Sequence, residues 1–152
     1  MRKVLLVVFA AALAGCSGSD EVAGNGPTAA LRCTTPTDPN PTLGTPFNVR
    51  AGDHATITSE RLTLTFRRVT EDTRCPQPMM CIIAGHATAG IDAARPPDAV
   101  GVFDLTIGDA GSDTATYAGY DVRLVGVLPY PEVGRTPTSL EDYCVQLTVV
   151  TH

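Results

Sequence analysis

The sequence contains little of what the common enzyme classes need. It has no tryptophan, which the usual stacking platforms for sugars contain, and its only lysine is Lys3. Nucleophilic catalysis needs a Ser, Cys or Thr beside a base, commonly His or Lys. No G-x-S-x-G nucleophile elbow occurs, and only five serines are present. We therefore expect a chain that is not an enzyme and that carries no cofactor.

Positive charge is also scarce. The 152 residues contain 11 Lys plus Arg against 16 Asp plus Glu, a formal net charge of −5. Binding to nucleic acid needs a clustered basic surface, and electrostatic adhesion to anionic lipid needs a polybasic segment. The charges here are scattered singly, which is the pattern of an ordinary solvated surface. The composition thus argues against a nucleic-acid partner and against electrostatic membrane binding.

Long apolar runs are absent except at the start. Residues 4–14 are uninterrupted apolar residues, too few for a bilayer-spanning helix, which needs roughly 20. Arg2 and Lys3 precede this run, and small residues follow it. A basic start, a short apolar core and small residues at its end are typical of a secretory signal peptide that is removed. We predict that residues 1–15 are this signal peptide.

The end of the run is more specific. Leu13-Ala14-Gly15-Cys16 resembles a lipobox, the processing site of bacterial lipoproteins. The resemblance implies cleavage before Cys16, a diacylglyceryl group on its thiol and acylation of its amine. It also implies an exported protein whose first partner is a membrane, held through the lipid anchor. Ser17 stands where an Asp would favour retention in the inner membrane, so the resemblance favours the outer membrane.

Composition divides the rest into two parts. Residues 16–45 are rich in Pro, Gly and Thr and offer few apolar side chains to offset the entropy of ordering. We predict a lipidated, flexible tether there. Residues 46–152 suffice for one domain, and their apolar residues recur with a period of two. The alternating segments are 47–50, 55–58, 61–67, 81–91, 101–107, 120–125 and 143–150, and a further strand begins near Thr114.

Six to eight short strands separated by Gly, Pro and Asp turns predict an all-β domain. With one buried face each, such strands form two packed sheets, a small disulfide-bonded β-sandwich, immunoglobulin-like or similar. A small closed β-barrel is the alternative.

Four cysteines remain once Cys16 is assigned to lipid. In an exported chain they predict two disulfides, with three connectivities. Cys144 is out of phase with the inward residues of its strand, so a segment outside the sheet should reach it, and Cys33 fits. Cys75 and Cys81 would then pair across the loop Pro76-Gln77-Pro78-Met79-Met80. Zinc is the competing use, but the spacing is not that of a structural site.

One further segment resembles a known group. Asp72-Thr73-Arg74-Cys75-Pro76, followed by Cys81 and Ala84-Gly85, is similar to the D-S-R-C-P…C…A-G pattern of uncharacterised bacterial envelope lipoproteins. The resemblance implies the paired Cys75–Cys81 loop and the β fold. It transfers no activity.

Two functional hypotheses from different classes follow. The first is a non-catalytic binding or structural module in the cell envelope, with an envelope protein as partner and the loop Pro76–Met80 as contact surface. A protease inhibitor, with Met79 or Met80 entering the enzyme's pocket, is one version. The alternative is a copper-binding protein, in which His86 joins the soft ligands Met79 and Met80.

Overall fold

The computed structural model describes residues 31–135, 137 and 139–152. The predicted signal peptide and Cys16 lie outside this part of the chain. Within it, no helix has the length and apolar character to cross a membrane. Two 3-10 turns, η1 (Thr58–Glu60) and η2 (Leu140–Asp142), accompany eight strands: β1 (Phe47–Arg50), β2 (His54–Ile57), β3 (Leu62–Asp72), β4 (His86–Ala94), β5 (Gly101–Gly108), β6 (Thr114–Tyr117), β7 (Tyr120–Leu128) and β8 (Cys144–Thr151).

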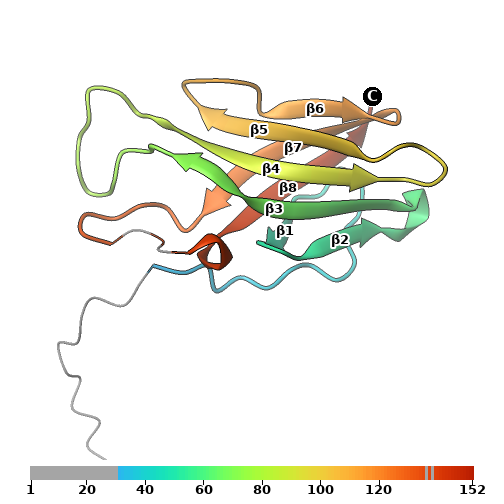
Figure 1. The fold of residues 1–152 in the computed structure, drawn as a ribbon, viewed down its shortest axis with the longest axis horizontal. Helices are drawn as coiled ribbons and strands as arrows, with labels where there is room; N and C mark the ends of the chain where they lie inside the picture. The colour runs from blue at the N-terminus through green and yellow to red at the C-terminus, as the bar shows by residue number, and fades with distance from the viewer. Residues whose placement is uncertain (1–30, 136, 138) are drawn as a thin grey trace, which may run out of the picture.

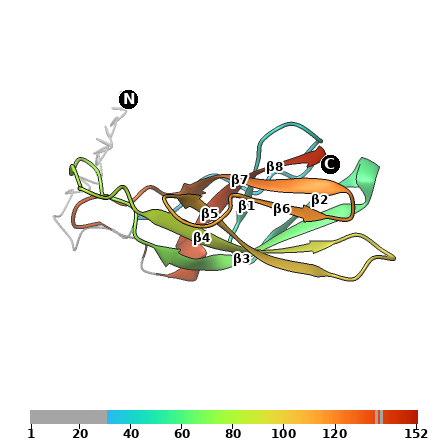
Figure 2. The ribbon, with the colours of Figure 1, turned by 90° about the horizontal axis from the view of Figure 1, so that it is seen from above.

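The strands form two antiparallel sheets of four. One has the order β1-β8-β7-β6 and the other β2-β3-β4-β5. Figures 1 and 2 show them as two layers facing each other. Each sheet keeps two edge strands, and the ladders among the described residues join no strand of one sheet to the other. The predicted β-sandwich is therefore confirmed, and the architecture is not a closed barrel.

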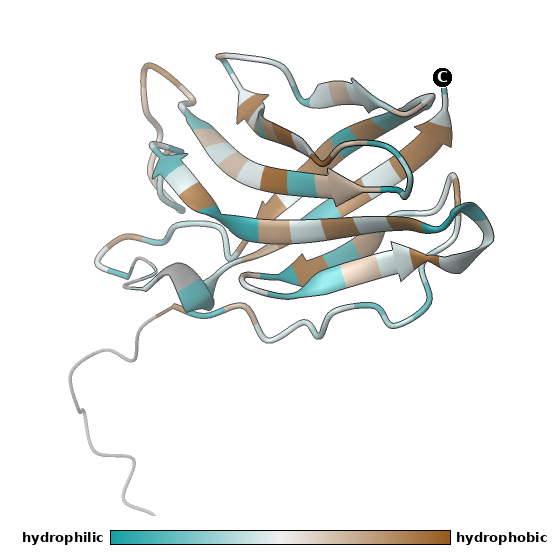
Figure 3. Cartoon of the chain, turned by 45° about the vertical axis from the view of Figure 1, so that its right-hand side comes forward, coloured by the Kyte–Doolittle hydropathy of each residue, from teal (hydrophilic) through white to brown (hydrophobic). Residues whose placement is uncertain are grey.

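The core lies between the two sheets and follows from the alternation in the sequence. Hydrophobic and hydrophilic bands alternate along the strands in Figure 3, because successive side chains of a strand point to opposite faces. The largest fully buried side chains come from both sheets. They include Phe47, Leu124 and Leu147 from the first sheet and Phe66, Leu62, Leu64, Ile91 and Leu105 from the second.

Strand β3 departs from simple alternation before it ends. Its pairing with β4 shifts register between Phe66 and Arg68 and again between Val69 and Glu71. An extra residue at such a bulge turns the following side chains to the other face. The alternation predicted for residues 61–67 stops at the first shift, and the strand continues to Asp72. These shifts decide which side chains β3 presents at its end.

The segment before β1 lies against the domain. Cys33 N–H donates to the carbonyl of Asp142 at 2.6 Å, and Gly44 N–H donates to that of Val149 at 2.8 Å. Pro41 is buried, and Leu43 packs against the core. The predicted tether reached residue 45, whereas the structure attaches residues 31–45 to the sandwich. Composition predicted an unattached segment because it contains no information on the disulfide and the backbone hydrogen bonds that fix this arm.

The two disulfides have the predicted pairing. Cys33 is bonded to Cys144, across 111 positions of sequence, and Cys75 is bonded to Cys81. Cys144 is fully buried although it faces away from the core, because the arm that carries Cys33 covers it. The long bridge fastens the arm to β8, and the short one closes a loop between β3 and β4.

Candidate contact site at the bridged loop

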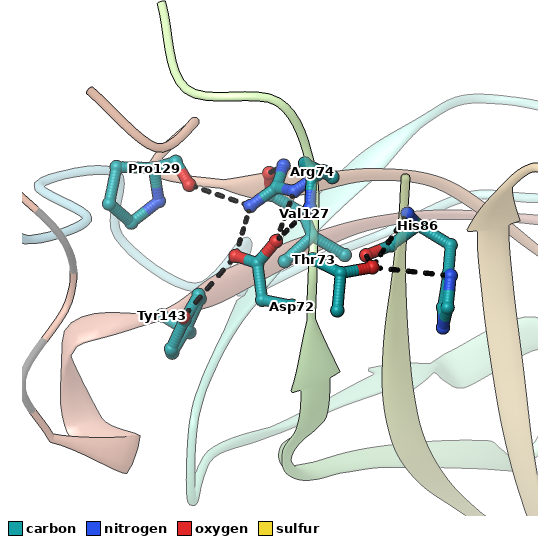
Figure 4. A network of polar contacts seen from close by, with 7 residues as sticks. All are labelled: Asp72, Thr73, Arg74, His86, Val127, Pro129 and Tyr143. Atoms are coloured by element: carbon teal, nitrogen blue, oxygen red, sulfur yellow. Dashed lines mark hydrogen bonds and ion pairs between the residues drawn. The ribbon is translucent and has the colours of Figure 1, made fainter. Parts of the chain in front are cut away.

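A buried ion pair stands where β3 leads into the bridged loop (Figure 4). Arg74 and Asp72 are two residues apart, so their side chains share a face. Arg74 Nε donates to Asp72 Oδ1 at 2.8 Å, and Nη2 donates to Oδ2 at 2.7 Å. The two side chains are only 5% and 8% exposed. This two-point geometry is the strongest form of an arginine–carboxylate contact.

The same guanidinium joins the two sheets. Its Nη1 donates to the carbonyl of Val127 at 2.6 Å, and Nη2 donates to that of Pro129 at 3.0 Å. Val127 lies near the end of β7, which is a strand of the other sheet, and Pro129 lies in the loop after β7. The guanidinium carbon also lies 4.8 Å from the centre of the Tyr130 ring. Arg74 therefore holds the loop after β7 against the loop after β3.

Tyr143, the residue between η2 and β8, completes the network. Its hydroxyl donates to Asp72 Oδ2 at 3.3 Å. Burial, and then the neighbouring Asp72 carboxylate, raise the pKa of Tyr143 to about 12. The phenol therefore stays protonated at neutral pH and serves as a donor. The network is a structural brace, because each polar group in it points to a partner within the protein.

Backbone hydrogen bonds hold the bridged loop on this brace. Cys75 N–H donates to the carbonyl of Ala84 at 2.9 Å. Gln77 N–H donates to the carbonyl of Pro131 at 2.9 Å, and its own carbonyl accepts from Val133 N–H at 2.9 Å. Figures 1 and 2 show the loop after β3 and the loop after β7 at the same end of the sandwich. The bridged loop is thus held by a disulfide and by a neighbouring loop.

This held loop nevertheless exposes apolar side chains. Met79 is 58% exposed, Met80 98%, Ile82 105% and Ile83 71%. Tyr130 and Val133 of the adjoining loop are exposed as well. We call the set Met79, Met80, Ile82, Ile83, Tyr130 and Val133 the apolar loop end. Several exposed apolar side chains on two adjoining loops mark a contact site more often than single exposed side chains do.

His86, the weak metal candidate, is the first residue of β4 and not a mid-strand residue. The strand was predicted over residues 81–91, but β4 begins five residues later, at His86, and residues 81–85 belong to the loop. The imidazole Nδ1 lies 3.3 Å from Thr73 Oγ1, and Nε2 lies 3.3 Å from Glu71 Oε2. Among the described residues, no three His, Cys, Asp or Glu side chains gather to hold a metal ion.

The order Thr73, His86, Glu71 has the residue types of a nucleophile, a base and an orienting acid. The Thr73 hydroxyl, however, is bonded to the backbone of His86, next to the last residue pair of the β3–β4 ladder. It accepts from the backbone N–H of His86 at 3.2 Å and lies 3.3 Å from the carbonyl of the same residue. A hydroxyl bound in this way secures the end of a strand pair. We assign this group a structural role.

A separate surface depression lies over β6, β7 and β8. It has a volume of about 540 Å³, and its lining includes Asp113, Arg123 and Val150. Arg123 Nε donates to Asp113 Oδ2 at 2.9 Å. Hydrogen bonds from Thr114 and then from Arg123 lower the pKa of Asp113. An ionised carboxylate already paired in this way is a poor general base, so we assign Asp113 no catalytic role.

Substituting Gly85 tests how tightly the loop closes. Gly85 has φ of +76°, and a Cβ there would collide with the backbone carbonyl of Thr73. We expect Gly85→Ala to lower the free energy of unfolding by roughly 2–3 kcal/mol, the combined cost of the left-handed backbone and the displaced strand end. Gly44→Ala is the matched control, because its φ is +75° and open space surrounds it. It should lose only about 1 kcal/mol. Urea unfolding measures both, and equal losses would contradict a close approach at Gly85.

The structure brings together much of what the sequence singled out. It places the bridged loop, Cys75 and Cys81 at one end, beside the arm that carries Cys33. Sequence reasoning did not identify Asp72 and Arg74 as a buried ion pair, although both residues are in the D-T-R-C-P segment. Their spacing was a usable signal, since oppositely charged residues two apart on a strand share a face.

Comparisons with known proteins do not assign the chain to a family. No protein-family model matches the chain, and neither a curated protein nor a solved structure does. The resemblances to bacterial lipoproteins and to their uncharacterised envelope group therefore stay predictions.

Proposed function

We propose that this chain is a non-catalytic lipoprotein of a bacterial cell envelope. In this proposal Cys16 carries the lipid, the outer membrane holds it, and the β-sandwich presents the apolar loop end as a contact surface. The exposure of four apolar side chains on a loop that is held in place is the observation that carries the proposal. A loop already held in one shape loses little conformational entropy when it binds.

Two further features support this role. The Leu13-Ala14-Gly15-Cys16 segment supplies the lipoprotein signal. The polar groups around the loop, above all Arg74 and Asp72, are buried and engaged with each other, so they are not available for chemistry on a substrate. What the loop end presents is apolar surface, which suits binding and not catalysis.

Replacing Cys16 tests the anchor. We expect the full chain produced in a Gram-negative bacterium to sediment with membranes and to carry the mass of a diacylglyceryl group and an amide-linked acyl chain. Cys16→Ser should lack the acyl mass, because a hydroxyl does not replace the thiol that receives the lipid. Each buried methylene contributes ~0.8 kcal/mol to anchoring, so the acyl chains dominate membrane affinity. Intact mass spectrometry of the membrane extract measures the modification directly.

Ser17→Ala is the matched control, because it changes the neighbouring residue and keeps the thiol. It should be acylated like the unchanged protein. An extracted protein with a free Cys16 thiol and no acyl mass would contradict the proposal. A stoichiometric metal ion retained in native mass spectra would instead support the copper alternative.

A further inference from the structure

We propose that the apolar loop end lies in the interface of the same membrane that holds the lipid anchor. Its contact partner would be the lipid surface, and the domain would have one orientation, with the apolar loop end facing the membrane. This inference rests on the proposed function, since it names the partner of the contact surface described there. It depends on four features of the described residues.

The first feature is the chemistry of the loop. From Cys75 to Ile91 the sequence contains no Asp, Glu, Lys or Arg. Met80 and Ile82 are almost fully exposed to water. Inserting this loop into a headgroup layer would remove apolar surface from water without burying a charge.

The second feature is the hydrogen bonding of the loop's backbone N–H groups. Pro76 and Pro78 have no N–H group. The N–H groups of Cys75, Gln77 and Met79 donate to the carbonyls of Ala84, Pro131 and Pro76, at 2.9, 2.9 and 2.8 Å. An unpaired backbone donor is costly to take out of water, and from Cys75 to Met79 the successive donors are absent or paired. This half of the loop can therefore leave water at a lower cost than an open segment of the same length.

The third feature is where the anchored part of the chain joins the domain. Leu31 and Arg32 line a cavity of about 270 Å³ together with Gln77 and Tyr130. The arm thus enters at the apolar loop end. Fourteen residues lie between Cys16 and Leu31, so the chain from one to the other spans at most about 50 Å when fully extended. The membrane that holds Cys16 is within this distance of the loop.

The fourth feature is the contrast between the two ends of the sandwich. The far end carries the β4–β5 turn, where Arg95 pairs with Asp98 at 3.6 Å. Glu60 also lies there, because its carbonyl accepts from Arg95 Nε at 3.1 Å. Charged groups of this kind favour water over the interface. At the apolar loop end the pair Arg135–Glu132 belongs to the loop after β7, whereas the bridged loop itself carries no charged residue. Tyr130, by contrast, is of a residue type that gathers at membrane interfaces.

The loop's chemistry favours lipid over a protein partner. Specific protein interfaces combine apolar contact with about one hydrogen bond per 100–200 Å². The most exposed side chains here, those of Met79, Met80, Ile82 and Ile83, have no N–H or O–H donor. Because the attraction is apolar, it needs no basic patch, which agrees with the acidic charge balance of the chain.

The absence of tryptophan allows a direct test. The full acylated protein would carry Met80→Trp, and a control would carry Val100→Trp. Val100 is 62% exposed and lies beyond the far end of β4, about 30 Å from the loop along a nine-residue strand. Each protein is reconstituted into phosphatidylcholine vesicles with or without bromine on the acyl chains, and tryptophan emission is recorded.

We expect brominated lipid to quench the Met80→Trp emission and to leave that of Val100→Trp unchanged. The same Met80→Trp emission should shift to shorter wavelength when vesicles are added. Both substitutions lie at exposed positions, and circular dichroism checks that the fold is kept.

Failure of this inference differs from failure of the proposed function. If Cys16 is acylated and both proteins sediment with vesicles while neither is quenched, the lipid-contact inference is wrong and the anchored module stands. Cross-linking of the loop to an envelope protein, without quenching, would also overturn it in favour of a protein partner. Absence of acyl mass on Cys16 would overturn the proposed function itself.

Discussion

Removing the Cys33–Cys144 disulfide by the double substitution Cys33→Ala/Cys144→Ala is expected to lower the free energy of unfolding by about 4–5 kcal/mol. In the chain-entropy model, a bridge stabilises the fold by restricting the unfolded chain, and the effect grows with the length of the closed loop. This bridge spans 111 positions and includes nearly the whole domain. Urea unfolding of the oxidised proteins measures the difference.

The second disulfide provides the matched control. Cys75 and Cys81 are only six positions apart, so Cys75→Ala/Cys81→Ala should lose about 2 kcal/mol. The long-bridge variant should also release the arm, because Cys33 is the covalent link between that segment and β8. Limited proteolysis would then cut within residues 31–45. Equal losses for the two variants, or an arm that stays protected, would contradict this account.

Replacing Arg74 by methionine should have the second large effect, a loss of about 3–5 kcal/mol. Methionine keeps an unbranched apolar stem and removes the charged guanidinium group. The substitution leaves the buried Asp72 carboxylate without its counter-ion, and breaking a buried pair on one side has a cost of this size. The carbonyls of Val127 and Pro129 also lose their donors. Denaturant unfolding again measures the change.

The surface supplies a matched control for this experiment. Arg123 pairs with Asp113 at 2.9 Å, but their side chains are 65% and 38% exposed. Arg123→Met should therefore lose less than about 1 kcal/mol, as exposed ion pairs do. Adding Asp72→Leu to Arg74→Met should recover part of the loss, because the orphaned carboxylate is then removed. If Arg74→Met loses no more than Arg123→Met, the brace does not have the energetic role assigned to it.

Both predictions concern the end of the sandwich that the proposed function uses. The Cys33–Cys144 bridge fixes the arm that leads towards Cys16, and Arg74 fixes the base of the bridged loop. A rigid base lets the loop present Met79, Met80 and their apolar neighbours without the entropy cost of ordering them on contact. Stability at this end and exposure of the apolar loop end are therefore parts of the same arrangement.

The sequence predicted the strands well where alternation is regular. Segments 47–50, 101–107 and 143–150 correspond to β1, β5 and β8, because one buried face imposes a period of two. Alternation failed as a guide at β3 and at the start of β4. Two register shifts in β3 change the face to which its later side chains point, and the left-handed Gly85 precedes the delayed start of β4. Such features depend on the partner strand, which a single segment does not encode.

Strand phase also predicted both disulfides. Cys144 is out of phase with Val145 and Leu147, so it needed a partner from outside the sheet. The same reasoning attached the arm at Cys33 but not along the rest of residues 31–45. Their composition resembles that of a tether, whereas backbone hydrogen bonds, the buried Pro41 and the packing of Leu43 hold them on the domain.

The sequence by itself determined the all-β class, the cysteine pairs and the residues of the bridged loop, because periodicity and spacing are local properties of a chain. Only the tertiary structure decided that Asp72 and Arg74 are buried together against the carbonyls after β7. It also decided that the arm and the apolar loop end meet at one end of the sandwich. These are contacts between segments more than 40 residues apart, and the packing of two sheets sets them. No local pattern of residues records that packing.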